Sequence, residues 1–357
     1  MPRDEPLVSV VIAVRDGAAY LRQAVESILA QTLGDLELMV VDDGSRDATP
    51  EILAEFARTD ERLRVLGGKP SGAGAARNRA GGQVRGRFLA AMDADDIALP
   101  SRLELQVDFL DSHPDVVVVG GAAMFVDEHG AELGVLEYAE ADAAVTELLN
   151  TGQSPVIHPA ATMRTQAFRV AVGYRTIFEV AYDYDLWLRM ASQGRITNIP
   201  QTVLGYRVHA GQVSTRNLRK TAEETCIALA SARARARGEA DPLDSAKSLD
   251  PTVMARLGVE PEEVAAREVH YALWLARTLA RGGRDDLAKP LWSIAIRRAG
   301  ATATARVTRA RVLRTRADAC LSRPLSFGLR LTAAALDPKG VVARRRLTRK
   351  AAGKRGE

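Results

Sequence analysis

The sequence predicts an α/β fold, a Rossmann-like and mostly parallel sheet flanked by helices, with an additional all-helical region at its C-terminal end. Three observations predict this fold. Short apolar runs alternate with helical patterns across the first third of the chain. Two of these runs stop abruptly in acidic residues, at Asp42 and at Asp93. Sequence rich in Ala and Arg, with helical spacing, then dominates the last third.

The first part of the chain consists of repeated strand and helix patterns. Strands are expected over residues 7–14, 36–41, 63–66, 88–92 and 116–121, with a continuation of the last to residue 126. Helices are expected over residues 20–29, 49–58, 75–80 and 141–150. Strands joined by right-handed crossovers lie parallel, so their carboxyl ends meet at one edge of the sheet, where ligands bind. The acidic residues expected at that edge are Asp42, Asp43, Asp93 and Asp95.

The acidic end of the fourth strand is the strongest sign of chemistry. Residues 88–92 are continuously apolar, and Asp93, Asp95 and Asp96 follow at once. Carboxylates this close repel one another by about 1 kcal/mol per pair unless a cation offsets them. Mg²⁺ or Mn²⁺ suits such ligands and is usually held by one or two carboxylates together with substrate phosphates. The pattern therefore indicates a metal site for a diphosphate substrate, with a solvated turn before Pro100 as the alternative.

Further candidate residues follow in the middle of the chain. Asp183 falls at the N-terminus of a helix expected over residues 182–190, where it either caps the helix or serves as a base in the crevice. Arg207 and His209 would share a face if they lie in a strand, and would present two cations to a phosphate. His158 is expected to be a neutral surface histidine, with a ligand role as the alternative.

Length and charge indicate two parts, an acidic one over residues 1–215 and a basic one over residues 216–357. Residues 1–210 carry 19 Lys and Arg against 30 Asp and Glu, a net charge of −11, whereas residues 211–357 carry 30 against 15, a net charge of +15. An anionic membrane surface is one candidate partner for the basic part. Nucleic acid is a weaker one, because stacking aromatics are scarce there and no zinc-finger or RNP-type motif appears.

The two cysteines, Cys226 and Cys320, lie far apart and lack metal-ligand spacing, which fits a reducing cytoplasm. The N-terminus is polar, and no run approaches the roughly 18 apolar residues of a spanning helix. We therefore expect a cytoplasmic protein that is neither exported nor membrane-spanning. Beyond a linker marked by Pro242 and Pro251, helices are expected over residues 264–281 and 286–299, and then over 301–321 and 325–336.

Together these pieces resemble the inverting glycosyltransferases of family 2, which have the nucleotide-sugar-binding fold called GT-A. The resemblance covers about residues 7–215. It rests on motifs in the family's order, Val8-Ser9-Val10-Val11-Ile12-Ala13-Val14, Val41-Asp42-Asp43-Gly44-Ser45, Ala76-Arg77-Asn78, Met92-Asp93-Ala94-Asp95-Asp96, Asp183-Tyr184-Asp185-Leu186-Trp187-Leu188-Arg189 and Tyr206-Arg207-Val208-His209.

The resemblance implies a role for each motif. It places Asp43, with Asp42 beside it, at the nucleotide base, which is typically uracil, and Asp93 near the ribose. It makes Asp95 the ligand of the metal that bridges the diphosphate. Asp183 would be the general base. The resemblance further implies that Arg207 and His209 meet the diphosphate or the metal from a closing loop, and that Arg77 lies at the nucleotide or the phosphates.

Two departures from the family pattern concern specificity. The family commonly has Pro-Val-Tyr-Asn after the first strand, where this chain has Ala13-Val14-Arg15-Asp16. Arg15 would then stack on the base in place of the aromatic ring, beside Ala13. Tyr182 stands where the family often has Glu, which points to a changed acceptor pocket.

The function expected from the resemblance is metal-dependent, inverting transfer of a sugar from a nucleoside diphosphate, typically UDP, to a hydroxyl acceptor in the cell envelope or a glycolipid. The alternatives are a nucleotide-sugar-binding scaffold without turnover and a nucleotidyltransferase, whose usual Gly-rich, Lys-containing loop is absent here. A dinucleotide oxidoreductase is disfavoured because no GxGxxG follows the first strand. The basic run from Arg344 to Lys350 is either a solvated tail or a peripheral attachment to the inner face of the membrane.

Overall fold

The fold is known from a computed structural model, which describes residues 5–136, 140–209, 211 and 217–298. The chain divides into two compact units. The first contains the sheet and comprises residues 1–212 together with 223–259, so it includes residues beyond the expected boundary at 215. The second comprises residues 213–222 and 260–357.

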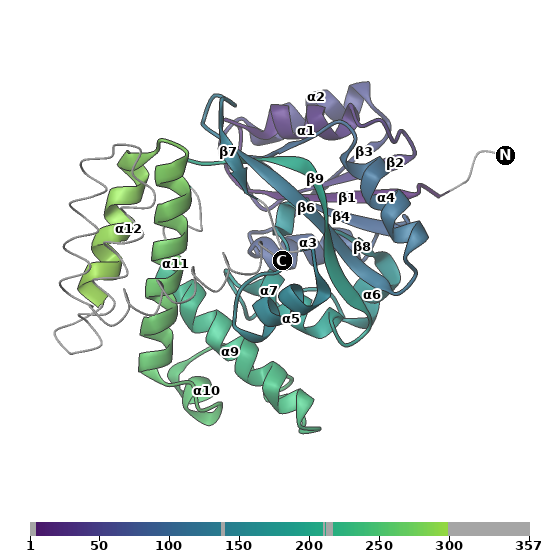
Figure 1. The fold of residues 1–357 in the computed structure, drawn as a ribbon. Coiled ribbons are helices and arrows are strands. Elements are labelled where there is room, and N and C mark those ends of the chain that lie inside the picture. The colour runs from purple at the N-terminus through teal and green to yellow at the C-terminus, as the bar shows by residue number, and fades with distance from the viewer. Residues whose placement is uncertain (1–4, 137–139, 210, 212–216, 299–357) are drawn as a thin grey trace, which may run out of the picture. The chain divides into compact units, whose positions relative to one another are not determined.

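The described residues form one nine-stranded sheet with the order β3-β2-β1-β4-β8-β6-β9-β5, and β7 pairs with β6 (Figure 1). The strands are β1 (Val8–Val14), β2 (Leu36–Asp42), β3 (Leu63–Gly67), β4 (Phe88–Asp93), β5 (Ile97–Ala98), β6 (Val116–Val126), β7 (Glu132–Leu136), β8 (Thr162–Arg164) and β9 (Arg195–Arg207). The helices of the first 212 residues are α1 (Leu21–Leu29), α2 (Thr49–Thr59), α3 (Ala73–Gly81), α4 (Arg102–Ser112), α5 (Asp142–Asn150), α6 (Thr165–Val170), α7 (Tyr182–Met190) and the short 3-10 helix η1 (His158–Ala160).

The predicted α/β class is confirmed, and the parallel order holds for half of the sheet. Strands β3, β2, β1 and β4 pair in parallel, as the strand and helix units predicted. The other half is mixed, because β8 runs antiparallel to both β4 and β6, while β6 and β9 are parallel. The chain enters β8 directly from η1 instead of through a crossover helix, which leaves it free to run antiparallel.

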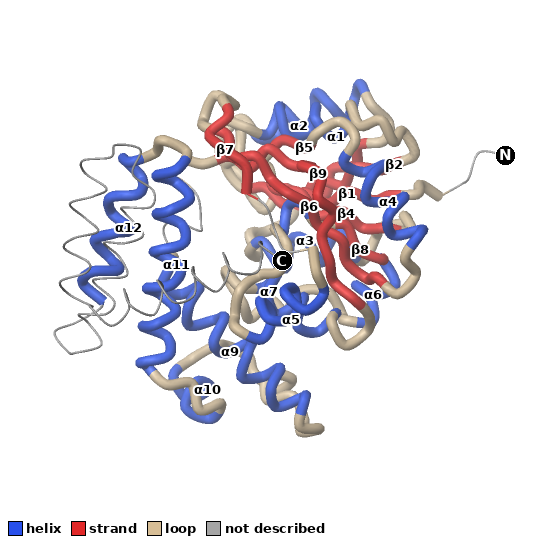
Figure 2. Tube along the Cα trace, viewed as in Figure 1, coloured by secondary structure: helices blue, strands red, loops and turns tan. Residues whose placement is uncertain are grey.

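The helices cover the sheet with their apolar faces. Helix α1 buries Leu21, Ala24, Val25 and Ile28, whose spacing of three and four residues makes one apolar stripe. This stripe belongs to the same buried core as Val8, Val10 and Ile12 of β1. In Figure 2, α1 and α2 lie along one side of the strands, and α3, α5, α6 and α7 lie along the other.

The remaining described helices are α9 (Leu218–Ala236), α10 (Pro251–Arg256), α11 (Pro261–Arg281) and α12 (Asp285–Arg298). Helices α11 and α12 pair within the second unit, at the positions expected from their helical patterns. No described helix is long and apolar enough to cross a lipid bilayer. The helices expected over residues 301–321 and 325–336, and the basic run over 344–350, lie outside the described residues.

Candidate functional site

The carboxyl ends of β2, β1 and β4 lie side by side. Ala13 pairs with Val41 on one side and with Asp93 on the other, and Val14 pairs with Asp42. The parallel register therefore brings Asp42 and Asp93 to the same edge of the sheet, one on each side of the end of β1. This is the edge at which ligands bind in open α/β sheets.

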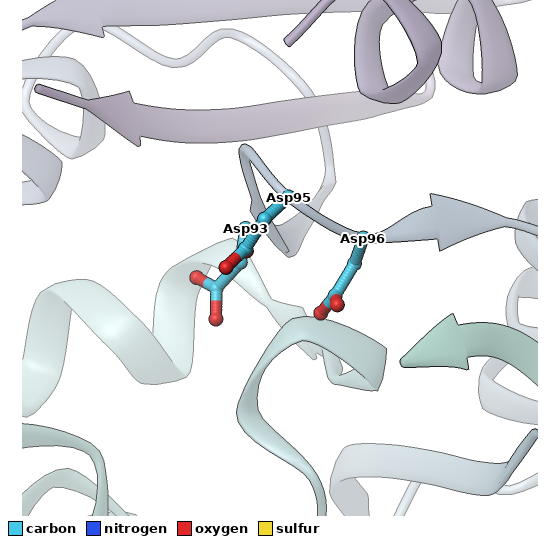
Figure 3. Close-up of side chains that lie close together, drawn as sticks. All are labelled: Asp93, Asp95 and Asp96. Atoms are coloured by element: carbon cyan, nitrogen blue, oxygen red, sulfur yellow. The ribbon is translucent and has the colours of Figure 1, made fainter. Parts of the chain in front are cut away.

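Three carboxylates cluster directly after β4. Oxygen atoms of Asp93, Asp95 and Asp96 all lie within 4.8 Å of one another, on the turn that Figure 3 shows. Asp96 is buried, with one oxygen accepting a hydrogen bond from the backbone N–H of Arg207 at 2.8 Å and the other without a hydrogen-bond partner. Burial, followed by the charges of Asp95 and Asp93, raises the pKa of Asp96 well above its usual range. A divalent cation with a preference for oxygen ligands fits this set of donors.

His209 extends the cluster. Its Nε2 lies 2.9 Å from Oδ2 of Asp95, and its ring packs against that of Tyr20, with the two centroids 5.0 Å apart. The side chain remains partly exposed. Asp95 and His209 thus offer one oxygen and one nitrogen ligand side by side, a combination that Mn²⁺ accepts.

Arg207 and His209 do not lie together on one face of a strand, the arrangement that would present two cations to a phosphate. Strand β9 ends at Arg207, whose side chain is fully buried. Its Nε donates to the carbonyl oxygen of Asp95 at 2.7 Å, and its Nη1 donates to the carbonyl oxygens of Asp127 and Glu128, each at 3.0 Å. Arg207 therefore braces the turn that carries Asp95 from within the protein.

Arg77 is also buried. It forms an ion pair with Asp93, and its Nη1 lies 3.2 Å from the hydroxyl oxygen of Tyr182, to which it donates. Burial raises the pKa of Asp93 although Arg77 acts in the opposite direction. In this structure the guanidinium is thus engaged with Asp93, the residue expected near the ribose.

A group of aromatic rings lies beside Asp93, whose Oδ1 is 3.9 Å from Nδ1 of His158. The ring centroid of His158 lies 5.7 Å from that of Tyr174 and 5.7 Å from that of Tyr182, and its Nε2 lies 2.9 Å from the Tyr174 hydroxyl. Burial, helped by the positive charges of Arg77 and Arg102, lowers the pKa of His158 well below its usual range. The expectation of a surface histidine is wrong, because η1 turns His158 inward, where its side chain is buried.

Asp183 and Asp185 occupy the first turn of α7 and have different surroundings. Asp183 is half-buried and makes no ion pair within the described part of the chain. Burial raises the pKa of Asp183 to about 6, with the nearby charge of Asp93 acting in the same direction. Asp185 is fully buried between Arg175, at 3.2 Å, and Arg189, at 2.7 Å. Asp185 is thus held in ion pairs, whereas Asp183 has no ion-pair partner among the described residues.

The residues expected at the nucleotide base differ in how many hydrogen bonds their side chains already make within the protein. Both oxygens of Asp43, which is buried, accept hydrogen bonds from Ser71 and from the backbone N–H of Gly72, at 2.8–3.0 Å. Asp43 therefore fixes the loop that leads into α3. Asp42 accepts one hydrogen bond, from the backbone N–H of Ser45 at 2.9 Å. Arg15 is exposed, with 52% of its side chain accessible, and its Nε lies 3.8 Å from Oδ2 of the neighbouring, exposed Asp16.

One further buried cation was missed in the sequence. Arg102, the first residue of α4, donates from Nη2 to the carbonyl oxygens of Ala91 at 2.8 Å and Ala161 at 3.3 Å. Burial lowers the pKa of Arg102 to about 10, although Asp96 and Asp93 act in the opposite direction. Its position six residues after Asp96 was the only sign in the sequence that Arg102 lies near the carboxylate cluster. An arginine in the first turn of a helix is commonly solvated.

Comparison with known proteins gives matches to glycosyltransferases. Residues 9–169 match the model of the family described as glycosyl transferase family 2. An uncharacterized glycosyltransferase of Haemophilus influenzae is 30% identical over 224 residues, which are 59% of this chain and 68% of that protein. An uncharacterized glycosyltransferase of Methanocaldococcus jannaschii is 30% identical over 209 residues, which are 57% of this chain and 72% of that protein.

The fold also resembles a solved structure. A mannosyltransferase from Pyrobaculum calidifontis, solved in complex with GDP-Man and Mn²⁺, aligns with a TM-score of 0.51 at 18% identity, covering 95% of this chain and 88% of that one. The expected GT-A fold class, with its additional C-terminal helices, is confirmed.

Proposed function

Because this chain belongs to glycosyltransferase family 2, we propose that it transfers a sugar from a nucleoside diphosphate to a hydroxyl acceptor, with metal dependence and with inversion at the anomeric carbon. The observation that carries the proposal is the cluster of Asp93, Asp95 and Asp96, whose oxygens lie within 4.8 Å of one another at the ligand-binding edge of the sheet. The complex of the Pyrobaculum mannosyltransferase with GDP-Man and Mn²⁺ supports a nucleotide-sugar donor and a divalent cation here.

Asp95 and His209 are the proposed metal ligands. Their ligand atoms, Oδ2 of Asp95 and Nε2 of His209, lie 2.9 Å apart. The carboxylate of Asp95 and the buried Asp96 oxygen that lacks a hydrogen-bond partner are oxygen ligands suited to Mg²⁺ or Mn²⁺. Such an ion, when bound, would offset the negative charge of the diphosphate as it departs. Arg207, whose side chain is buried, contributes by holding the Asp95 backbone in place through its hydrogen bond to the Asp95 carbonyl oxygen.

The donor's nucleoside is proposed to lie across the ends of β2, β1 and β4. The nucleotide base would lie at Asp42 and Asp43, beside Ala13. The exposed guanidinium of Arg15 would stack on the face of the base. Asp93 would then lie at the ribose, with its carboxylate oriented by Arg77. UDP is the nucleotide expected from the family pattern.

Asp183 is the proposed general base. Its carboxylate takes the proton of the acceptor hydroxyl while the acceptor oxygen attacks the anomeric carbon from the face opposite the diphosphate. The bond between that carbon and the diphosphate oxygen breaks, and the leaving nucleoside diphosphate keeps the electron pair. A pKa of about 6 suits this role, because the carboxylate is ionised at neutral pH and still basic enough to accept a proton.

The proposed acceptor and the proposed location in the cell rest on the family and on the charge distribution of the chain. A hydroxyl of a cell-envelope polysaccharide or glycolipid is the proposed acceptor. The basic sequence after residue 216 would hold the enzyme peripherally at an anionic membrane, on its cytoplasmic side. A scaffold that binds a nucleotide sugar without turnover would share the donor site but would have no use for a carboxylate whose pKa lies near 6.

The proposal is tested by screening nucleotide sugars for Mn²⁺- or Mg²⁺-dependent hydrolysis and for protection of the protein against thermal unfolding. We expect one donor to protect the protein only with metal and to be turned over slowly with water as acceptor. A variant at the exposed Asp108, Asp108→Ala, is the control and should behave as the wild type. Protection without any turnover would favour the scaffold, and no protection by any nucleotide sugar would overturn the proposal.

A further inference from the structure

The helix that carries Asp183 has no capping side chain of its own. Its N-cap residue is Ala181, which makes no side-chain hydrogen bond. Glu224 on α9 instead holds the residues that lead into the helix: its buried carboxylate accepts hydrogen bonds from the consecutive backbone N–H groups of Glu179, Val180 and Ala181 at distances between 2.9 and 3.1 Å. Three N–H groups just before a helix therefore converge on one anion, an arrangement that the helix dipole also favours.

A second anchor lies on the other side of Asp183. Arg175 bridges Asp185 of α7, at 3.2 Å, and Asp241, at 2.6 Å. Burial disfavours the charge of Asp241, but hydrogen bonds from Ser231 and Arg175 outweigh it and hold the pKa of that carboxyl well below its usual range. Asp241 thus stays charged, and the start of α7 is tied to the turn that follows α9.

Asp183 lies between the two anchors, two residues after Ala181 and two before Asp185. Glu224 and Asp241 both come from residues 223–259, which lie in the same compact unit as the sheet and beyond the family match over residues 9–169. We infer that Glu224 is a positioning residue that holds the Asp183 carboxylate in its reactive orientation. This inference rests on the proposed function of Asp183 as the general base.

A carboxylate that only stabilises the fold and one that positions a catalytic group have different consequences when they are removed. Loss of a purely stabilising contact lowers the melting temperature and leaves kcat unchanged in folded protein. Loss of a positioning contact lowers kcat, because a displacement of about 1 Å in a reacting group costs roughly 100-fold in rate. Asp250 supplies a control, since it is a carboxylate of the same unit that also accepts from backbone N–H groups at the start of a helix, those of Thr252 and Val253 in α10.

The experiment compares Glu224→Ala, Glu224→Gln and Asp250→Ala well below their melting temperatures. We expect Glu224→Ala to lower kcat by roughly 10- to 100-fold, with the donor KM within about twofold of wild type. Glu224→Gln keeps one acceptor oxygen and should recover part of the loss. Asp250→Ala should keep the wild-type kcat. If Glu224→Ala does not fold, Glu224→Gln carries the same comparison with a smaller effect.

A double variant separates action through Asp183 from any other effect. If Glu224 acts through Asp183, the Asp183→Asn/Glu224→Ala variant is no slower than Asp183→Asn alone, because the positioned group is already lost. Hydrogen exchange should also speed up for the amides of residues 179–183 in Glu224→Ala and not in Asp250→Ala.

Three results would overturn the inference alone: an unchanged kcat in folded Glu224→Ala, losses that multiply in the double variant, or unchanged exchange of those amides. Near wild-type turnover of Asp183→Asn would instead overturn the proposed base, and with it this inference.

Discussion

Replacing Asp183 with Asn tests the proposed base with almost no change in shape. The amide cannot accept the acceptor's proton, and general-base catalysis is typically worth roughly 10²- to 10⁴-fold in rate. At 1.36 kcal/mol for each factor of ten, the activation barrier should rise by about 2.7–5.4 kcal/mol. Binding of the nucleoside diphosphate and metal should stay close to wild type, because the proposed ligands Asp95 and His209 are unchanged.

The pH dependence of turnover provides an independent test of Asp183 as the base. The pKa of Asp183 is raised to about 6, and the base acts only in its ionised form. Wild-type turnover should therefore be complete above about pH 7 and fall as the pH drops through 6, about tenfold for each unit below it. This acidic limb should be absent from the pH profile of Asp183→Asn.

Asp185→Asn is the necessary comparison, because Asp185 is the rival carboxylate on the same helix turn. Its removal leaves the partly buried Arg175 and Arg189 without the fully buried carboxylate that they share, so we expect a loss of about 3–5 kcal/mol in the free energy of unfolding. The acidic limb near pH 6 should persist in the folded fraction. Steady-state kinetics from pH 5 to 8 decides between them, and an intact limb in Asp183→Asn, with its loss in Asp185→Asn, would refute the assignment.

Other predictions concern the metal, the backbone and the tail. Asp95→Ala should abolish the metal-dependent part of nucleoside diphosphate binding in calorimetry while the fold persists; unchanged metal dependence would exclude Asp95 as a ligand. Val172→Gly should stabilise the protein by about 1 kcal/mol in denaturant unfolding, because Val172 has a left-handed φ of 59° and is 86% exposed, whereas Val170→Gly in helix α6 should destabilise it. A loss of stability in Val172→Gly would refute the assigned strain. Truncation after Leu336 should reduce co-sedimentation with anionic vesicles, and equal sedimentation of both proteins would rule out attachment through the basic tail.

The strand pattern of the sheet's parallel half could be predicted because its determinants are local. Apolar runs of five to eight residues with acidic ends, separated by amphipathic helices, sufficed to place Asp42 and Asp93 at one edge. The mixed half depends on β8, which has only three residues and carries no periodicity of its own. Its antiparallel pairing with β4 could not be read from so short a segment.

The surroundings of the site residues could not be predicted from the sequence, for a different reason. The motif suggests that Arg207 is a cation available to phosphate. Its N–H groups instead donate to the carbonyl oxygens of residues 95, 127 and 128, which are far away in the chain. His158 turns inward because a 3-10 helix precedes β8. The contact of Glu224 with residues 179–181 likewise joins segments more than 40 residues apart. Such contacts follow from packing, which a motif does not encode.

The central claim is a single displacement in which Asp183 deprotonates the acceptor, and the stereochemistry of the product tests it most directly. The linkage formed from an α-linked nucleotide sugar can be assigned by NMR from the one-bond coupling between its anomeric carbon and anomeric proton. We expect a β-linked product, because the acceptor attacks from the face opposite the diphosphate. An α-linked product would require a different mechanism and would rule out a single displacement with Asp183 as the base.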